Sequence, residues 1–416
     1  MSENEVKTVL FVHYGSQWLR GSERTLLDIL EHLPRQEYEP IVWTNNRVLA
    51  DELKKLDMEC IVSDFKLIAQ YQSPMLPIWS WLRQIVQALQ LIRRHKVSLI
   101  HINSGGPCQW MTLASRMSGV PCLAQIHCCY SQRDRFVLFT HLANRISCVS
   151  QAVADGYTMD KQSVPVTINH NGIDQERFSH HTDINIREVY NFKPDDFILL
   201  SVGSLIKRKG YDKLVQAVAQ LHQQGFAIRL ILIGEGSERR SLENLVKQYK
   251  LSDSIIFAGE QKMVGGYYRA EFDAFISTTR VEAFGLVNAE AAMHGLPVIA
   301  PNIDGLKDIF TKPEHAQFIS RDTTEDIATA IKHLYENPER RKSIAQSGQQ
   351  RIKQHFLIQH NMERLLNDYC LLMNNTTKKE RRVGVLSYLK ELMTTIIIPA
   401  VTRRRRLQST QGTISS

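Results

Sequence analysis

The chain has 416 residues, of which 43% are hydrophobic and 23% are charged, a composition typical of a globular enzyme of two or three domains. No apolar run approaches the ~20 residues that a membrane-spanning helix needs, and the apolar run near the N-terminus is too short for a signal peptide. The seven cysteines follow no disulfide or zinc spacing, so we expect Cys128 and Cys129, beside His127, to be buried reduced thiols rather than metal ligands. We therefore expect a cytoplasmic protein.

The formal net charge of +8 is concentrated at the C-terminal end of the chain. Residues 376–416 hold nine Lys/Arg and two Glu, which account for seven of the eight net charges. The rest of the chain is nearly neutral, which argues against a nucleic-acid-binding face. The apolar segment 383–398 lies between basic clusters. We therefore expect residues 378–406 to dock on an anionic membrane surface, although a solvated tail fits the same pattern.

Strand and helix patterns alternate along the first half of the chain. Lys7–His13 is predicted to be a buried strand, and a loop opens a helix at Gly21. Short apolar strands separated by helical segments are typical of a doubly wound parallel sheet. The other expected elements are strands over Tyr38–Thr44, Val97–Ile102, Pro121–Ile126 and Arg145–Ser150, and an amphipathic helix over Trp79–His95.

The same alternation begins again near residue 197, so we expect two Rossmann-like domains, over residues 1–178 and 195–355. The polar, aperiodic segment 174–195 is typical of a linker. Ligands of such sheets bind beyond the carboxyl ends of the strands, which favours a site in a cleft between the two domains. The expected elements are strands over Phe197–Val202, Ala227–Ile233, Ser254–Phe257, Phe272–Ser277 and Pro297–Ala300, and helices over Lys209–Gln223, Glu238–Tyr249 and 323–375.

Two glutamates, Glu282 and Glu290, flank a predicted turn and short helix. Gly285 permits the turn, and the helix after it is expected to end at Gly295. The helix start presents unpaired N–H groups and a positive dipole end to an anion, while carboxylates accept hydrogen bonds from hydroxyls. This combination suits a sugar that carries phosphate. A helix with two solvated carboxylates fits the segment equally well.

A basic turn precedes the glutamates in the segment Ser201–Gly210, which follows a predicted strand and opens a helix. Gly203 lets the backbone turn closely. Arg208 and Lys209 lie where the helix dipole disfavours cations, so they indicate an anionic partner such as a diphosphate. A basic turn on the surface is the alternative. The segment matches neither the P-loop nor the G-x-G-x-x-G pattern.

Three weaker signals accompany these segments. Residues 233–238 are either a tight turn or a loop near a nucleotide base. His127 ends a strand, where a histidine is more often structural than catalytic. Gly15, Gly21 and Ser22 follow the first strand and would let the backbone approach a phosphate or an acceptor.

In order and spacing, these segments resemble family 4 of the retaining glycosyltransferases, which have the GT-B fold, from about residue 8 to residue 375. The resemblance implies an α/β protein whose two Rossmann-like, doubly wound parallel-sheet domains face each other across a cleft. It also implies that a helix over 356–375 crosses back to the first domain, before the basic tail 376–416. The matching pieces are Gly21–Arg24, His127, Asn171–Asp174, Gly203–Gly210, Gly234–Gly236, and Glu282 to Glu290 followed by Gly295–Val298.

The resemblance also implies roles for individual residues. Glu290 would hold the ribose hydroxyls, Glu282 the donor sugar, and His127 would reach that sugar from across the cleft. The implied catalytic residues are Glu282, His127, Arg208 and Lys209, and the implied substrate-binding residues are Gly21, Ser22, Gly203, Phe284, Gly285, Leu286 and Glu290. Neither a metal nor a cofactor is expected, because fixed cations and a helix N-terminus stabilise the departing diphosphate.

The implied activity is metal-independent transfer of a sugar, with retention, from a UDP- or GDP-linked donor to a hydroxyl acceptor. The acceptor would be a glycan or a lipid-linked molecule of polysaccharide, lipopolysaccharide or glycolipid biosynthesis, which would place the protein in the cytoplasm or on the cytoplasmic face of the inner membrane. A non-catalytic GT-B partner that binds a nucleotide sugar is the alternative, and a phosphorylase or epimerase of this fold is a third option. The chain departs from the usual pattern at Ser22, Ser204 and Asp304.

Overall fold

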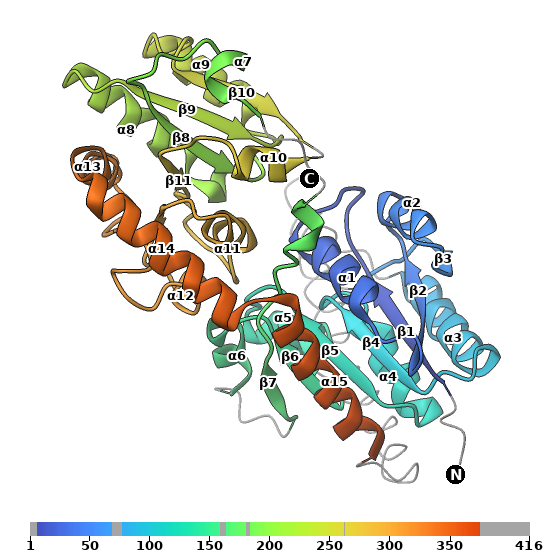
Figure 1. Cartoon of the computed structure of the whole chain (residues 1–416). Coiled ribbons are helices and arrows are strands. Elements are labelled where there is room, and N and C mark those ends of the chain that lie inside the picture. Colours follow the sequence, from blue (N-terminus) through green and yellow to red (C-terminus); the bar gives the residue numbers. More distant parts are fainter. Residues whose placement is uncertain (1–5, 69–76, 159–163, 180–183, 262, 375–416) are drawn as a thin grey trace, which may run out of the picture. The chain divides into compact units, whose positions relative to one another are not determined.

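The computed structural model describes residues 6–68, 77–158, 164–179, 184–261 and 263–374, which form two compact units (Figure 1). Of the described residues, one unit comprises 6–68, 77–148, 156–158, 164–167 and 365–374, and the other comprises 149–155, 168–179, 184–261 and 263–364. Each is built around its own sheet, so the predicted architecture of two parallel-sheet α/β domains is confirmed. The basic segment 378–406 lies outside the described residues. Among the helices that are described, none has both the length and the apolar character to cross a bilayer.

The N-terminal unit has a seven-stranded sheet with the order β3-β2-β1-β4-β5-β6-β7. From β3 to β6, neighbouring strands pair in parallel. Residues 9–12 of the central strand β1 are fully buried, as the apolar run predicts. The strands are β1 Lys7–His13, β2 Tyr38–Thr44, β3 Cys60–Val62, β4 Leu99–Asn103, β5 Cys122–Ile126, β6 Arg145–Cys148 and β7 Val166–Ile168.

Helices connect these strands, and the last of the described helices, α15 (Ile358–Asn374), also reaches this unit. The Tyr369 hydroxyl of α15 lies 2.6 Å from Nδ1 of His101 on β4, and both residues are fully buried. This hydrogen bond ties α15 to the N-terminal sheet. The other helices are α1 Gly21–His32, α2 Arg47–Lys55, α3 Ile78–Arg94, α4 Cys108–Ser118, α5 Gln132–Val137 and η1 Thr140–Leu142. Helix α6 Gln151–Thr158 is divided, because its residues 151–155 group with the other unit.

The C-terminal unit has a six-stranded sheet with the order β10-β9-β8-β11-β12-β13. All of its strands pair in parallel, so their carboxyl ends share one edge. The apolar faces of two helices, α8 and α13, pack on it around Leu199 and Leu230. The strands are β8 Phe197–Val202, β9 Ile228–Ile233, β10 Ile255–Gly259, β11 Ala274–Ile276, β12 Val298–Pro301 and β13 Gln317–Ile319.

Two long helices of this unit, α13 and α14, begin at a cap or a proline. The Thr323 hydroxyl accepts a hydrogen bond from Asp326 N at the start of α13, and Pro338 occupies the first turn of α14. The helices are η2 Glu176–Phe178, α7 Ile186–Val189, η3 Lys207–Lys209, α8 Tyr211–Gln223, α9 Arg239–Gln248, α10 Val264–Tyr268, α11 Leu286–Met293, α12 Asp304–Lys307, α13 Thr324–Glu336 and α14 Pro338–His355.

The segment 174–195 differs from the expected linker. Phe178 and Ile186 are buried, and contacts group residues 168–178 with the C-terminal unit. The unit boundary therefore falls before residue 178. The two buried apolar side chains were not recognised in the sequence, because the segment is polar overall.

Two loops at the carboxyl edge of the second sheet pack backbone against backbone. Gly203 N donates to Ile233 O at 2.9 Å, and Leu205 N donates to Glu235 O at 3.0 Å. Gly234 has φ +135°, and a Cβ there would lie 2.1 Å from the carbonyl oxygen of Gly203. The loops after β8 and β9 therefore need glycine for contact with each other, which explains the segment 233–238 as a close-packed turn.

We expect Gly234→Ala to lower the free energy of unfolding by roughly 2–4 kcal/mol, because it adds a steric clash to an unfavourable φ. Gly225→Ala is the matched control, since Gly225 has φ +88° but no atom within 4 Å of an added Cβ. It should cost only about 1 kcal/mol. Urea unfolding of the two variants measures both values, and equal losses would contradict the packing argument.

Candidate active site

The carboxyl edge of the second sheet brings together the basic turn and the glutamate segment. Gly203, Arg208 and Lys209 follow β8, and the segment from Glu282 to Glu290 follows the neighbouring strand β11. The Lys209 carbonyl oxygen accepts a hydrogen bond from the Thr278 hydroxyl at 3.0 Å, which joins the two loops. These predicted residues therefore lie at the edge where parallel α/β sheets bind ligands.

Glu282 supplies the anionic partner that the two cations require. Its Oε2 lies 2.6 Å from Lys209 Nζ and 3.8 Å from Arg208 Nη1. The Lys209 and Glu282 side chains are only 14% and 15% exposed, so this ion pair is largely desolvated. Arg208 also donates to the Val281 carbonyl oxygen at 2.6 Å. The cations lie in the 3₁₀ turn η3, and α8 begins two residues after Lys209, at Tyr211, rather than at Lys209 as expected.

Glycines shape the turn between Glu282 and α11. Gly285 is the N-cap of α11 with φ +100°, and a Cβ there would lie 2.3 Å from Leu306 Cδ2. A Cβ on Gly305 would lie 2.0 Å from the Glu282 carbonyl oxygen. The chain departs from the usual family pattern at Asp304 but retains Gly305, and Gly305 is the position where a side chain would clash with Glu282.

The start of α11 presents N–H donors that have no acceptor among the described residues. In the described part of the chain, the N–H groups of Phe284, Gly285 and Leu286 donate to no acceptor. Asn288 is fully buried one turn further on, and neither atom of its amide has a partner among the described residues. A helix start with unpaired N–H groups is a suitable place for an anion or a sugar hydroxyl. Asn288 was not predicted, because a helical asparagine has no distinctive sequence pattern.

Glu290 is held by two residues that the sequence did not indicate. Its Oε1 lies 2.5 Å from Arg177 Nη2, and its Oε2 accepts from the Tyr268 hydroxyl at 2.9 Å. Burial, followed by the charge of Glu290, raises the pKa of Tyr268 well above its usual value, so this hydroxyl remains a donor. Arg177 lies in the segment predicted to be a linker, and no local signal distinguished it. The Glu290 carboxylate is thus fixed in one orientation but retains unused lone pairs.

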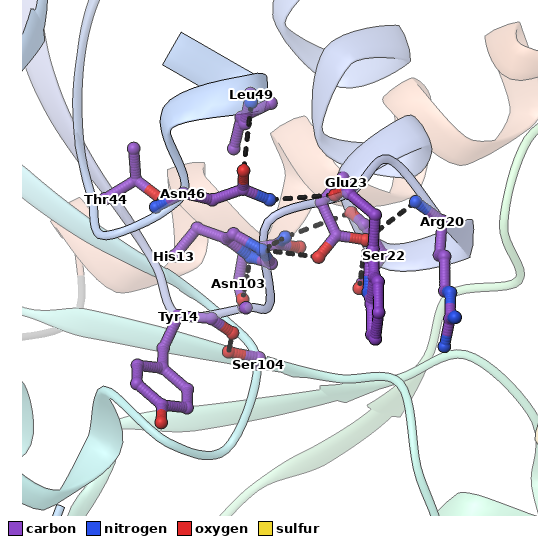
Figure 2. A network of polar contacts seen from close by, with 12 residues as sticks. His13, Tyr14, Arg20, Ser22, Glu23, Thr44, Asn46, Leu49, Asn103 and Ser104 are labelled. Carbon is purple, nitrogen blue, oxygen red and sulfur yellow. Dashed lines mark hydrogen bonds and ion pairs between the residues drawn. The ribbon is translucent and has the colours of Figure 1, made fainter. Parts of the chain in front are cut away.

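A second polar cluster lies in the N-terminal unit, at the ends of β1, β4 and β5 (Figure 2). His13 Nε2 lies 3.0 Å from Glu23 Oε1, and both side chains are almost completely buried. His13 Nδ1 lies 2.9 Å from the Asn103 carbonyl oxygen. His127 Nε2 lies 2.7 Å from Asn103 Oδ1. The cluster therefore links His127 to a buried histidine–glutamate pair through one asparagine.

The hydrogen bonds of Asn103 define the proton positions on His127. Asn103 Nδ2 donates to the Ser22 carbonyl oxygen at 3.1 Å, so the Oδ1 that faces His127 must accept. His127 thus carries its proton on Nε2, and its Nδ1 has no partner among the described residues. Desolvation, followed by the charge of His13, lowers the pKa of His127 to about 3. His127 is therefore a neutral hydrogen-bond acceptor at physiological pH.

The Glu23 carboxylate is ionised despite its burial. Burial raises the pKa of Glu23, but the hydrogen bond and charge of His13 outweigh it, and the pKa lies below its usual value. The Arg20 N–H also donates to Glu23, at 3.0 Å. A Cβ on Gly15 would lie 2.4 Å from Glu23 Oε1 and 2.7 Å from His13 Nε2. Gly15 thus makes room for the buried pair, a structural role that the sequence did not indicate.

The remaining candidates of the N-terminal unit lie at the start of α1. Gly21 is its exposed first residue. The Ser22 hydroxyl donates to Glu23 Oε2 at 3.1 Å, so Ser22 contributes to the same cluster. The expectation that Cys128 and Cys129 are buried is wrong, since both are exposed. Within the described residues, no group of three His, Cys, Asp or Glu side chains is placed to bind a metal.

We expect His101→Gln to flatten the acid dependence of stability. Burial lowers the pKa of His101 to about 4, so between pH 4 and about 6.5 the unfolded chain binds more protons than the folded chain. Stability therefore falls as the pH drops through this window, by on the order of 3 kcal/mol for this residue. Urea unfolding at pH 7 and pH 4 should show a smaller difference in His101→Gln than in the native chain. The exposed His333→Gln is the control, and equal slopes in the two variants would contradict the assignment.

Two family models match the chain, one in each half. The model described as "Glycosyltransferase Family 4" matches residues 19–177, and "Glycosyl transferases group 1" matches residues 182–351. The O-antigen biosynthesis glycosyltransferase WclY of Escherichia coli is 32% identical over 157 residues, which are 38% of this chain and 43% of WclY. The chain thus spans less than half of WclY. The capsular polysaccharide biosynthesis glycosyltransferase CapM of Staphylococcus aureus is 23% identical over 79% of this chain and 92% of CapM.

Solved structures share the fold over most of the chain. The structure of Anabaena HepE in complex with UDP-glucose has a TM-score of 0.73 at 19% identity, and the match covers 88% of this chain and all of HepE. At this identity the likeness concerns the fold. The two family models and the two parallel sheets agree with it. The chain belongs to the family 4 glycosyltransferases and has their GT-B fold.

Proposed function

We propose that the chain transfers a sugar from a nucleotide-sugar donor to a hydroxyl acceptor, with retention of configuration and without a metal. The observation that carries this proposal is the convergence of Lys209, Arg208 and Glu282 beside the unpaired N–H groups at the start of α11. Breaking the bond between a sugar and a nucleoside diphosphate develops negative charge on the phosphate. Fixed cations and N–H donors stabilise that charge.

Other residues bind the ribose and the sugar of the donor. Glu290, oriented by Arg177 and Tyr268, accepts hydrogen bonds from the ribose hydroxyls. Glu282 and the N–H groups after it hold the sugar. His127 accepts a hydrogen bond from a sugar hydroxyl through Nδ1, since its Nε2–H donates to Asn103 Oδ1. No side chain is assigned as a nucleophile, and the departing phosphate takes the proton of the acceptor.

The names of relatives support a role in surface-polysaccharide biosynthesis. WclY is named for O-antigen biosynthesis and CapM for capsular polysaccharide biosynthesis. We therefore propose a glycan or lipid-linked acceptor, and catalysis at the cytoplasmic face of the membrane where such acceptors are presented. HepE in complex with UDP-glucose favours UDP as the first donor base to be tested.

We expect UDP or a UDP-sugar to raise the thermal midpoint of the full chain. A ligand at a hundred times its Kd adds about 2.7 kcal/mol to the free energy of unfolding. GDP-, ADP- and CMP-sugars are the comparison panel in a thermal-shift measurement. If none of the four classes shifts the midpoint, the donor site is wrong, whereas a GDP-specific shift would correct only the base.

We expect Lys209→Met to lower kcat by about a hundredfold to a thousandfold, because it removes a cation from the leaving diphosphate. Glu290→Gln should chiefly raise KM for the donor, because it weakens the ribose contact without removing a cation. Lys312→Met, at an exposed lysine of the same unit, is the matched control. Nucleotide release that requires an added acceptor is the readout.

These measurements also separate the competing functions. A non-catalytic nucleotide-sugar-binding protein would show the thermal shift without acceptor-dependent release. A phosphorylase or an epimerase would convert the donor without the acceptor. Unchanged kcat in Lys209→Met, with the fold intact, would contradict the proposed diphosphate site.

A further inference from the structure

The outward face of α3 is apolar over its first turns. Ile78, Leu82 and Val86 recur every four residues and so lie along one line of the helix, with Trp79 beside them. The Trp79 side chain is 85% exposed and Val86 is 53% exposed, and the other two are also exposed. Figure 1 shows α3 at the outer edge of the N-terminal unit, next to α4. We call these four side chains the α3 stripe.

The stripe is distinct from the core-facing side of the helix. That side carries its own apolar residues, Trp81, Ile85, Ala88 and Ile92, and these are buried in the unit. The stripe lies about a quarter turn around the helix from them, so the apolar surface of α3 continues from the core-facing side onto the exposed side. A single exposed apolar residue is common on soluble proteins, but four contiguous ones that include a tryptophan indicate an interaction surface.

The chain around the stripe carries only positive charge. Between Asp64 and Asp134 the sequence contains no Asp or Glu, although these residues number 43 in the whole chain. The same stretch contains seven Lys/Arg, and three of them, Arg83, Arg93 and Arg94, are exposed on α3. An apolar stripe flanked by arginines and without acids is complementary to an anionic apolar partner.

We propose that the α3 stripe is a docking surface for an anionic lipid bilayer. The indole of Trp79 and the aliphatic side chains enter the boundary between headgroups and acyl chains, while Arg83, Arg93 and Arg94 bind lipid phosphates. The helix lies in the plane of the surface and does not cross it. This surface is independent of the transfer reaction and belongs to the part of the chain that the structure describes.

Charge distinguishes a bilayer from other occupants of the stripe. A second copy of the chain would place two acid-free basic helices against each other. The C-terminal segment 376–416 is itself strongly basic, so like charges would also meet if it covered α3. An anionic bilayer meets the stripe with opposite charge and with apolar chains.

Trp79 offers a direct reporter of docking. The chain has five tryptophans, of which Trp43, Trp81 and Trp110 are buried. In a full-length Trp18→Phe variant, Trp79 is therefore the exposed indole. With vesicles of phosphatidylcholine and phosphatidylglycerol, we expect its emission to shift to shorter wavelength and to be quenched by lipids brominated on the acyl chain. Vesicles of phosphatidylcholine alone should produce much smaller changes.

Matched variants of the full chain test the energetic contribution. Trp79→Ser should weaken cosedimentation with anionic vesicles about tenfold or more, since burial of a large aromatic side chain is worth more than the 1.4 kcal/mol that a factor of ten requires. Val189→Ser, at an apolar residue of the second unit that is 62% exposed, should have no effect. The pair Arg93→Glu and Arg94→Glu should weaken binding more than Lys247→Glu and Lys250→Glu in the second unit.

Three outcomes would overturn the proposal. Absence of binding to anionic vesicles is the first. Binding without quenching of Trp79 is the second, and it would assign docking to the C-terminal segment instead. A shift of Trp79 emission that depends on protein concentration and not on vesicles is the third, and it would identify a second copy as the occupant.

Discussion

Close contact between backbone segments at the carboxyl edge of the second sheet positions the candidate active site. The carbonyl oxygen of Gly203 lies 2.1 Å from where a Cβ of Gly234 would be, and the carbonyl oxygen of Glu282 lies 2.0 Å from where a Cβ of Gly305 would be. Each contact joins loops that follow different strands. The ion pair of Lys209 and Glu282 also joins two loops, those after β8 and β11. Each loop of the site is thus held in place by contacts with a neighbouring loop.

Each unit places a carboxylate with little exposure beside a basic side chain, but the two pairs have different consequences. In the C-terminal unit, Lys209 and Glu282 remain partly accessible, so a ligand can compete for either partner. In the N-terminal unit, His13 and Glu23 are almost completely buried, so a ligand cannot contact them directly. His127 bonds to Asn103, which also contacts His13, but the tautomer of His127 follows from the Asn103 amide, and its neutral state follows first from its own burial and second from the charge of His13. The first pair suits binding, and the second suits the positioning of a hydrogen-bond acceptor.

The sequence predicted the strands well because buried parallel strands are short apolar runs with clear ends. Lys7–His13, Tyr38–Thr44 and Phe197–Val202 match the structure residue for residue. It did not predict α4, because residues 108–115 of that helix are all buried and no polar face marks a helical period. The basic turn after β8 was predictable because two adjacent cations near a helix start are unfavourable without an anionic partner.

The partners of the site residues were harder to predict than the site residues themselves. Arg177 lies 113 positions before Glu290, and Asn103 lies 90 positions after His13, so no local pattern connects them. Gly15 carried a visible signal, and the structure adds a reason that the sequence did not indicate, since its missing side chain makes room for the His13–Glu23 pair. Contacts of this kind depend on which strands become neighbours, and strand order is not encoded in the pattern of a single strand.

The ion pair in the second unit also bears on how a diphosphate would be released. Arg208, Lys209 and Glu282 together carry one net positive charge, whereas the two cations alone would carry two. A site with two uncompensated cations would bind the nucleoside diphosphate product tightly as well as the transition state, and such uniform binding does not raise kcat. Glu282 offsets part of that ground-state attraction, because Lys209 already has a partner 2.6 Å away. Under the proposed function, the Glu282 carboxylate therefore favours release of the nucleoside diphosphate. Lys209 stabilises the leaving phosphate most in the transition state, where the negative charge on that phosphate grows and competes with Glu282 for the lysine.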